Sequence, residues 1–370
     1  MEGTCLPQLI KLAVPICQAA EKSCPRTGPG RKPEIPDWAI AVLIAVAVLK
    51  QKKSKSSQFR YLHSHRKWFA EQLQIDRLPS RSTYFERYKK AWRLLEVAIS
   101  KAGDMAIESG MVDARCVAAD QSVIRARGPL WNQRHVQRGV VPRAADRDAT
   151  WSRSAWHGWT LGYSYEVIVS AEKTGAVWPL LASADPASHK PNRTFPPKVE
   201  RLHPSVRYLL ADSGYDSTDL ADLVELRPDQ KRTGRRLLCP YPKHRRGQVS
   251  GKHKETKTRK ARRLRRQQRF EFFQRPFAQR LIKRRGMKVE PFNDWLKTRF
   301  DLHDESGTRG SITIAHNYSR PSLERRFFSC TTTNADRKME LSNGFSTHYE
   351  FPDTLCEQPE LPRPVLPEPT

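Results

Sequence analysis

The chain has 370 residues, with 66 Lys and Arg against 39 Asp and Glu, which leaves a formal net charge of +27. The protein cannot neutralise this excess internally, so we expect a polyanionic partner, and nucleic acid is the usual one because basic side chains displace condensed counterions from phosphates. The longest apolar run, residues 38–49, is shorter than the roughly 20 residues that span a bilayer, so we expect no membrane partner.

The cysteines and the N-terminus indicate the compartment. Seven cysteines are scattered along the chain without any C-x-x-C pair, so neither a zinc site nor a disulfide framework is predicted. No basic segment leads into an apolar stretch at the N-terminus, so no secretory signal is visible. Reduced thiols are typical of the cytoplasm. We therefore expect a cytoplasmic protein that is associated with the nucleoid.

Residues 1–110 have helical patterning. Asp37 precedes the apolar run 38–49 and can cap the free N–H groups of a helix that starts there. This helix is apolar on nearly all sides, which predicts that it is buried among others. A polar, basic break follows at 50–57, and helical spacing returns over 59–73.

The segment 80–90 predicts one more helix in this region, basic and aromatic, with Ser80 as its cap. Three helices of which the last is basic are typical of a helix-turn-helix-like DNA-binding domain. An ordinary helical bundle with a solvated basic face would give the same periodicity. Both interpretations stay open for residues 1–110.

The pattern changes near residue 111, where buried strands are predicted. The strand candidates are 115–119, 163–171, 176–182 and 206–211. The first ends at Asp120 and the last at Asp212, the second and third are joined by a turn at 173–175, and 198–202 has helical character. Strands followed by helices predict an α/β core.

A very basic segment follows over 227–269, with 18 Lys or Arg and two acids. Mutual repulsion predicts an extended, solvated segment unless an anion binds it. A DNA-contacting insertion and a disordered loop are both compatible with this composition. Helical periodicity returns over 270–281 and 287–300. Beyond Glu305 the sequence is rich in polar residues and then in Pro, and it predicts no core element.

Acids at two strand ends and one on a later helix, in a very basic chain, favour metal-dependent phosphodiester chemistry. Two Mg²⁺ ions roughly 3.5–4 Å apart can activate the attacking oxygen and stabilise the leaving one. Mg²⁺ prefers hard carboxylate oxygens, so a few carboxylates on rigid elements suffice. A single Asp at a strand end is weak evidence, because Asp is common at turns.

Residues 211–217 read Ala-Asp-Ser-Gly-Tyr-Asp-Ser. This segment resembles the A-D-x-G-Y-D-S block around the second catalytic acid of the DDE transposases of bacterial insertion sequences. Residues 288–297 read Lys-Val-Glu-Pro-Phe-Asn-Asp-Trp-Leu-Lys, which resembles the third block with its acid-x6-Lys pair. The first block is less specific: Asp120 within 118–122, followed by Gly158-Trp159 and Gly162-Tyr163. The similarity runs from about residue 35 to Asp304.

The resemblance implies an RNase H-like α/β fold, a mixed sheet with flanking helices, preceded by the helical domain. It implies an enzyme that cuts double-stranded DNA at the ends of its mobile element and joins them to target DNA. Asp120 and Asp212 would hold both metal ions, Mg²⁺ or Mn²⁺, and Glu290 would complete the site. We expect a homodimer on DNA.

The resemblance also suggests which cations contact DNA. Glu290 and Lys297 are seven residues apart, two turns of a helix, so they share a face, and Lys297 would hold a DNA phosphate. Related proteins carry an Arg four residues before the Glu, where this chain has Gly286. The neighbouring Arg285, with Arg284 beside it, is assigned to that role. Glu271 is the alternative third acid, but it lacks a Lys seven residues later.

The chain departs from the family after the third block. Family members continue with a helix that opens on an Asn-Asn-x-Thr-Gln-Leu-Leu-like run, whereas residues 311–321 read Ser-Ile-Thr-Ile-Ala-His-Asn-Tyr-Ser-Arg-Pro. Codons can be chosen so that the neighbouring frame encodes the expected run. This predicts a frameshift close to Glu305, which makes 305–370 an irregular tail after a catalytic domain of 111–304. Two rivals remain, another two-metal nuclease of this fold and a basic DNA-binding protein with an inactive catalytic domain.

Overall fold

The structure, a computed structural model, describes residues 6–24, 33–52, 54–126, 129–142, 145–154, 158–173, 177–227, 231–240 and 256–300, together with Gly175 and Asp229. The predicted tail 305–370 and the centre of the predicted basic insertion, 241–255, lie outside the described residues. No helix in the described part of the chain is long and apolar enough to cross a membrane.

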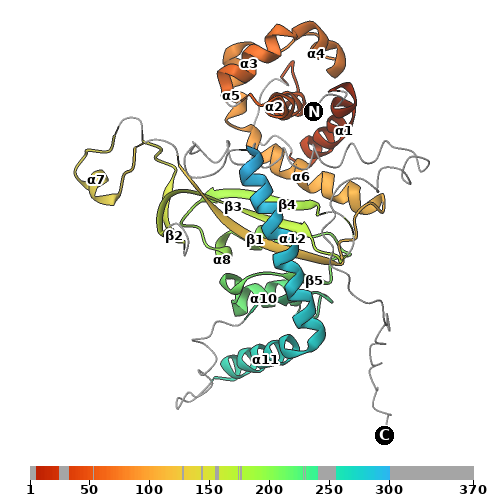
Figure 1. Ribbon diagram of the computed structural model, residues 1–370, viewed down its shortest axis with the longest axis vertical. Coiled ribbons are helices and arrows are strands. Elements are labelled where there is room, and N and C mark those ends of the chain that lie inside the picture. Colours follow the sequence, from red (N-terminus) through yellow and green to blue (C-terminus); the bar gives the residue numbers. More distant parts are fainter. Residues whose placement is uncertain are drawn as a thin grey trace, which may run out of the picture. The chain divides into compact units, whose positions relative to one another are not determined.

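In the described residues of the N-terminal region there are six helices, and α2 is at their centre (Figure 1). They are α1 Leu6–Ser23, α2 Asp37–Leu49, α3 Lys55–Ser64, α4 Arg66–Leu73, α5 Arg81–Tyr88 and α6 Ala91–Glu108. Every residue of α2 from Ala39 to Val48 is buried, as its apolar sequence predicts, and one hydrophobic cluster joins it to the surrounding helices.

The starts of these helices differ in part from the sequence prediction. Ser80 caps α5 as expected, since its side chain accepts a hydrogen bond from the Thr83 amide. Asp37 does not cap α2: Pro36 occupies the cap position, and the Asp37 carboxylate instead accepts hydrogen bonds from Arg87 of α5 (2.8 Å from Nε). The predicted break at 50–57 is shorter than expected, because Ser54 and Ser57 form a capping box that starts α3.

The second region is built on a six-stranded mixed sheet. Its strands are β1 Cys116–Arg125, β2 Thr150–Ser154, β3 Gly158–Ser170, β4 Pro179–Pro186, β5 Tyr208–Leu210 and β6 Arg236–Leu238. The order is β2-β3-β1-β5-β6, with β4 paired to β3. β1, β5 and β6 run parallel, and the other pairings are antiparallel. The predicted mixed sheet with flanking helices is therefore confirmed.

The predicted end of the first strand at Asp120 is wrong. β1 continues to Arg125, because β3 pairs with it antiparallel along its whole length, from Val117 opposite Ser170 to Arg125 opposite Gly162. The two strands come so close at Gly162 that a Cβ there would lie 2.0 Å from the Ile124 carbonyl oxygen. Asp120 therefore lies inside a strand rather than in a turn.

The expectation that 227–269 is extended is wrong for α11 (Lys257–Gln274), which is a regular helix. The described residues of α11 up to Arg269 are mostly exposed, as expected of a solvated segment. β6 is extended, but it pairs with β5 in the sheet. Repulsion within α11 is relieved by carboxylates of α10 (Thr218–Glu225) and of the turn before it. The ion pairs are Arg262–Asp219, Arg265–Asp222 (2.9 Å), Arg266–Asp216 (3.2 Å) and Arg269–Asp222 (3.8 Å).

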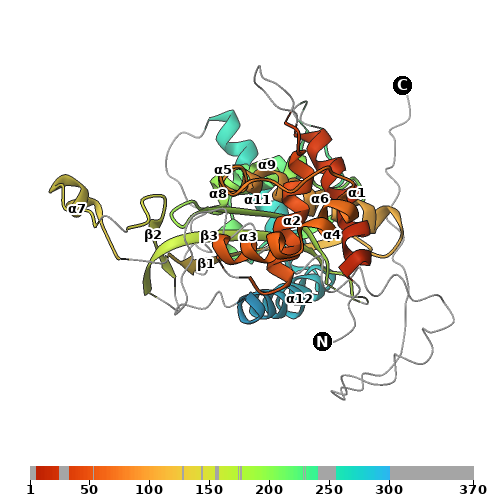
Figure 2. The ribbon, with the colours of Figure 1, turned by 90° about the horizontal axis from the view of Figure 1, so that it is seen from above.

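Helices cover both faces of the sheet (Figure 2). The predicted helix 287–300 belongs to one long helix, α12 (Pro276–Phe300), whose apolar residues pack with alternate residues of β1 and β3. The short helices α8 (Pro191–Thr194) and α9 (Pro196–Glu200) lie on the opposite face with α10 and the 3₁₀ turn η1 (Ser213–Tyr215). α7 (Gln133–Gln137) belongs to the excursion between β1 and β2.

One contact of α6 makes folding depend on pH. Glu96 accepts a hydrogen bond from the Ala184 amide of β4 (3.2 Å), and burial raises the pKa of its carboxyl from 4.5 to about 7. A group whose pKa is higher in the folded state binds more protons there, so its contribution to stability is lost as the pH rises.

We predict that the free energy of unfolding falls between pH 4.5 and pH 7, by at most about 3 kcal/mol through Glu96. Glu96→Gln carries no titrating group and should flatten this part of the profile. Urea denaturation of both proteins across that range measures the difference. Parallel profiles would contradict the assigned role of Glu96.

Candidate active site

Asp120 lies at the centre of the site, on β1 and facing α12. Its side chain is only 15% exposed. One carboxylate oxygen accepts a hydrogen bond from Nη2 of Arg285 (2.6 Å), and the other accepts one from Nδ2 of Asn293 (2.6 Å). Both donors belong to α12, so this helix is fixed to the sheet at the carboxylate itself.

Arg285 also contacts Glu290, five residues later on the same helix. Nη1 of Arg285 lies 3.4 Å from Oε1 of Glu290, whose side chain is 64% exposed. One guanidinium thus bridges a half-buried carboxylate of β1 and a solvated carboxylate of α12. The longer distance and the exposure indicate that Glu290 is held less firmly than Asp120.

Asp212 reaches the site from the end of β5. Ala118 pairs with Leu210 across the parallel strands β1 and β5, so Asp120 and Asp212 each come two residues after a paired position and lie at the same level of the sheet. Asp212 caps the turn η1, because its Oδ1 accepts a hydrogen bond from the Gly214 amide (2.9 Å). The parallel pairing brings together two acids that are 92 residues apart in the sequence.

The charges around Asp120 change the pKa of its carboxyl in opposite directions. Burial raises the pKa of its carboxyl above the ordinary value, while the Arg285 guanidinium lowers it. The Asp212 carboxylate raises the pKa further, as a like charge does at short range. The Arg285 guanidinium therefore offsets part of the effect that burial and Asp212 have on the pKa of Asp120.

The third candidate acid and its neighbours share a face of α12. Gly286, Glu290, Asn293 and Lys297 are spaced by four, three and four residues, the spacing of one helical face. A Cβ on Gly286 would lie 3.5 Å from Oε1 of Glu290, an ordinary contact. Lys297 is half-buried on this face, and no ion pair engages it among the described residues.

The other candidates lie elsewhere. Arg284 pairs with Glu172 (3.2 Å) rather than with the acids of the site. Glu271, the alternative third acid, is on α11, where it accepts a hydrogen bond from Gln267 of its own helix (3.0 Å). Among the described residues, Glu290 and not Glu271 contacts a group that also holds Asp120.

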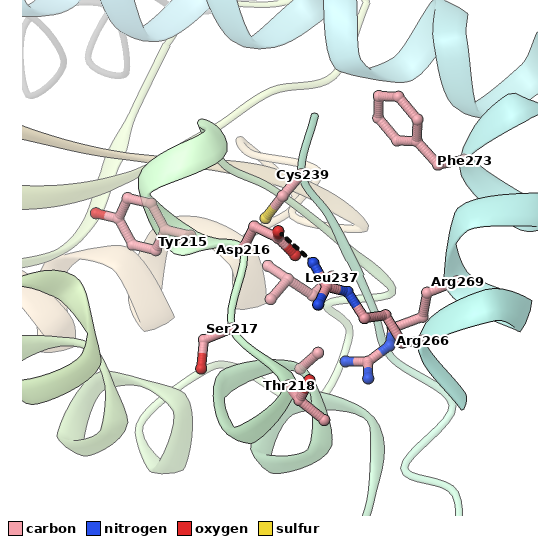
Figure 3. A pocket seen from close by; sticks show the side chains of 10 residues that line it. Tyr215, Asp216, Ser217, Thr218, Leu237, Cys239, Arg266, Arg269 and Phe273 are labelled. Carbon is pink, nitrogen blue, oxygen red and sulfur yellow. Dashed lines mark hydrogen bonds and ion pairs between the residues drawn. The ribbon is translucent and has the colours of Figure 1, made fainter. Parts of the chain in front are cut away.

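A small pocket lies beside the Asp212 turn, between η1, the start of α10 and α11 (Figure 3). Figure 3 shows Asp216 pointing to Arg266, the ion pair described above, with Arg269 and Phe273 on the wall that α11 forms. The pocket is thus closed on one side by the basic helix. The sequence does contain a signal for this contact, since the acids 216, 219 and 222 and the arginines 262, 266 and 269 both recur at helical spacing.

The side chains around Asp120 offer carboxylate oxygens as donors for a divalent metal. Within the described residues, no three His, Cys, Asp or Glu side chains come close enough together to hold a metal ion. The guanidinium of Arg285 lies between Asp120 and Glu290. That guanidinium marks a position where a cation is stabilised by two carboxylates, with Asp212 beside them. Hard oxygen donors of this kind suit Mg²⁺ or Mn²⁺, so the residues fit such an ion.

Asn293 and the bridging role of Arg285 were missed at the level of sequence. Asn293 follows Glu290 by three residues inside the third block, and that spacing alone could have placed it on the face of the acid. The link from Arg285 to Asp120 spans 165 residues, and no local pattern predicts it.

Comparison with known proteins identifies a family for this chain. The model of a protein family described as "Transposase DDE domain" matches residues 112–313, a range that includes all three candidate acids. No curated protein and no solved structure matches the chain significantly.

The ion pair between Asp120 and Arg285 predicts energetic coupling. Arg285→Met removes the counter-charge of a half-buried carboxylate and should cost about 2 kcal/mol of unfolding free energy. In the double variant Asp120→Asn/Arg285→Met the loss should be smaller than the sum of the single losses, by on the order of 1–2 kcal/mol. Urea denaturation of the four proteins gives the coupling energy.

Arg284→Met is the matched control, because Arg284 pairs with Glu172 instead. Its effect should add to that of Asp120→Asn within about 0.5 kcal/mol. Additive losses for Arg285 as well would show that its contact with Asp120 contributes nothing.

Proposed function

Because the chain belongs to the family of transposases with a DDE domain, we propose that it cuts the ends of its insertion sequence and joins them to target DNA through Asp120, Asp212 and Glu290. Its α/β fold is the RNase H-like fold of that family. The observation that carries the assignment is the arrangement of the acids: Asp120 and Asp212 at one level of parallel strands, and Glu290 joined to Asp120 through Arg285.

Asp120 and Asp212 would hold two Mg²⁺ or Mn²⁺ ions, and Glu290 would complete the set of ligands. When bound, such ions supply activation of the attacking oxygen and stabilisation of the leaving oxygen of the phosphodiester. Asn293 holds one oxygen of Asp120 and so orients the carboxylate. The exposed Glu290 can turn toward the other acids once Arg285 releases it.

The cations of α12 would bind the substrate. Arg285 already lies at the acids, and a DNA phosphate offers its guanidinium a bidentate partner once the carboxylates have another cation. Lys297, on the same face as Glu290, would hold a phosphate near the site. Arg284 is less suited to that role, because Glu172 occupies it. In phosphoryl transfer, such positioning and charge stabilisation supply most of the catalysis.

The remaining parts of the chain would bind double-stranded DNA around the cut. We propose residues 1–110 as the end-binding domain, with α5 in a helix-turn-helix-like arrangement, and residues 111–304 as the catalytic domain. The net charge of +27 and the basic segment 227–269 support contact with the phosphate backbone. Two copies on one DNA complex would let each act on one end of the element.

The test is cleavage of a labelled duplex that carries the sequences flanking the gene, with Mg²⁺ or Mn²⁺. The full chain should nick the strand at the element end. Asp212→Asn and Glu290→Gln should each slow cleavage by at least about a hundredfold, since each removes a negatively charged oxygen donor. Glu271→Gln is the control and should cleave at the rate of the unmodified protein.

Each outcome decides one part of the proposal. Tight DNA binding without cleavage by the unmodified chain would identify a binding protein with an inactive catalytic domain. Cleavage by Asp212→Asn at the rate of the unmodified protein would contradict the assignment of Asp212 as a catalytic acid. If Glu271→Gln slowed cleavage and Glu290→Gln did not, Glu271 would be the third acid instead of Glu290.

A further inference from the structure

A buried polar cluster lies on the face of the sheet opposite α12. It consists of Glu166 of β3, Lys198 of α9 and Tyr215 of η1, which are 1%, 3% and 1% exposed. Nζ of Lys198 donates to Oε2 of Glu166 (2.5 Å), and the Tyr215 hydroxyl donates to Oε1 of the same carboxylate (2.5 Å). Nζ of Lys198 also donates to the carbonyl of Thr194 (2.7 Å).

The burial of this cluster excludes a direct role in chemistry. Water and DNA cannot reach groups that are so completely covered. Burying two charges costs free energy unless both are paired and hydrogen-bonded, and here the Glu166 carboxylate is satisfied on both oxygens. The cluster therefore allows one geometry, and it fixes the elements that carry its members.

Those elements carry the catalytic acids. Glu166 pairs across the sheet with Gln121, the residue next to Asp120. Tyr215 closes the 3₁₀ turn that Asp212 opens, so the hydroxyl of Tyr215 ties this turn to the strand beside β1. The cluster thus joins the support of Asp120 to the support of Asp212 from behind the sheet.

We propose that Tyr215 is a positioning residue, whose hydrogen bond to the Glu166–Lys198 ion pair holds the Asp212 carboxylate at the metal-binding site. The identity of that site rests on the proposed function. Burial, with the Glu166 carboxylate beside it, raises the pKa of Tyr215 well above its ordinary value, so the phenol stays protonated and donates. The Tyr215 ring also packs edge-on against Phe195, with 5.2 Å between the ring centroids.

Tyr215→Phe tests the proposal because it removes the hydroxyl and keeps the ring against Phe195. Three readouts apply to the full-length protein: hydrogen exchange of the Gly214 amide, which is bonded to Asp212; Mn²⁺ affinity from the free-ion electron paramagnetic resonance signal; and kcat and KM for cleavage. We expect faster exchange, about tenfold weaker Mn²⁺ binding and a lower kcat at unchanged KM for DNA.

Tyr163→Phe is the matched control. Tyr163 lies on β3 and, like Tyr215, is buried. Its hydroxyl donates to a carboxylate, as that of Tyr215 does, but the acceptor is Asp146 (2.7 Å). This variant loses the same kind of hydrogen bond away from the Asp212 turn, so its exchange at Gly214 and its Mn²⁺ affinity should match the unmodified protein.

The proposal is overturned if Tyr215→Phe behaves as the unmodified protein in exchange and Mn²⁺ affinity, or if Tyr163→Phe is impaired to the same extent. Failure of the proposed function gives a different result. In that case Asp212→Asn would bind Mn²⁺ as tightly as the unmodified chain, while Tyr215→Phe would still accelerate exchange at Gly214 and so support the anchoring of the turn.

Discussion

The ion pair between Asp120 and Arg285 is the interaction on which the site depends. It places a guanidinium from α12 against a carboxylate of β1 that is mostly shielded from water, where an unpaired charge would be costly. Asn293 adds a second contact two turns further along α12. Because the helix is fixed at these points, Glu290 is brought to the same edge of the site as Asp120. The position of Glu290, the proposed third acid, thus follows from the contacts of one half-buried carboxylate.

The sheet supplies the other half of the arrangement. Parallel pairing of β1 and β5 sets Asp120 and Asp212 at one level, although only three residues of each strand pair directly. On its other side β5 pairs with β6, and the Ala211 amide just before the turn donates to the Leu238 carbonyl. Contacts on the far face of the sheet, through Tyr215 and the ion pair beneath it, also support this turn. The position of the acids on the α12 face of the sheet therefore depends on Tyr215, Glu166 and Lys198 on the opposite face.

The features that depend only on neighbouring residues could be predicted from the sequence. The apolar run of α2, the cap at Ser80 and the block around Asp212 all depend on neighbouring residues, and each could be recognised from the chain alone. The end of β1 was misplaced because the apolar run stops at Asp120 while the pairing with β3 continues. The arginines of residues 257–274 pair with acids of α10, in segments that are about forty residues apart in sequence. The helical spacing of the charges could have suggested two charged helical faces, but that these two faces meet is a matter of tertiary structure.

We propose that Asp120, Asp212 and Glu290 form one divalent-metal site, and that a bound cation would take the place of the Arg285 guanidinium beside Asp120. A crystal of the full-length chain soaked in Mn²⁺, with anomalous scattering measured at the manganese edge, tests it most directly. We expect an anomalous peak in contact with Asp120 and Asp212, with the Arg285 guanidinium displaced from Asp120. A peak away from these carboxylates, or Arg285 still bonded to Asp120 at saturating Mn²⁺, would contradict it.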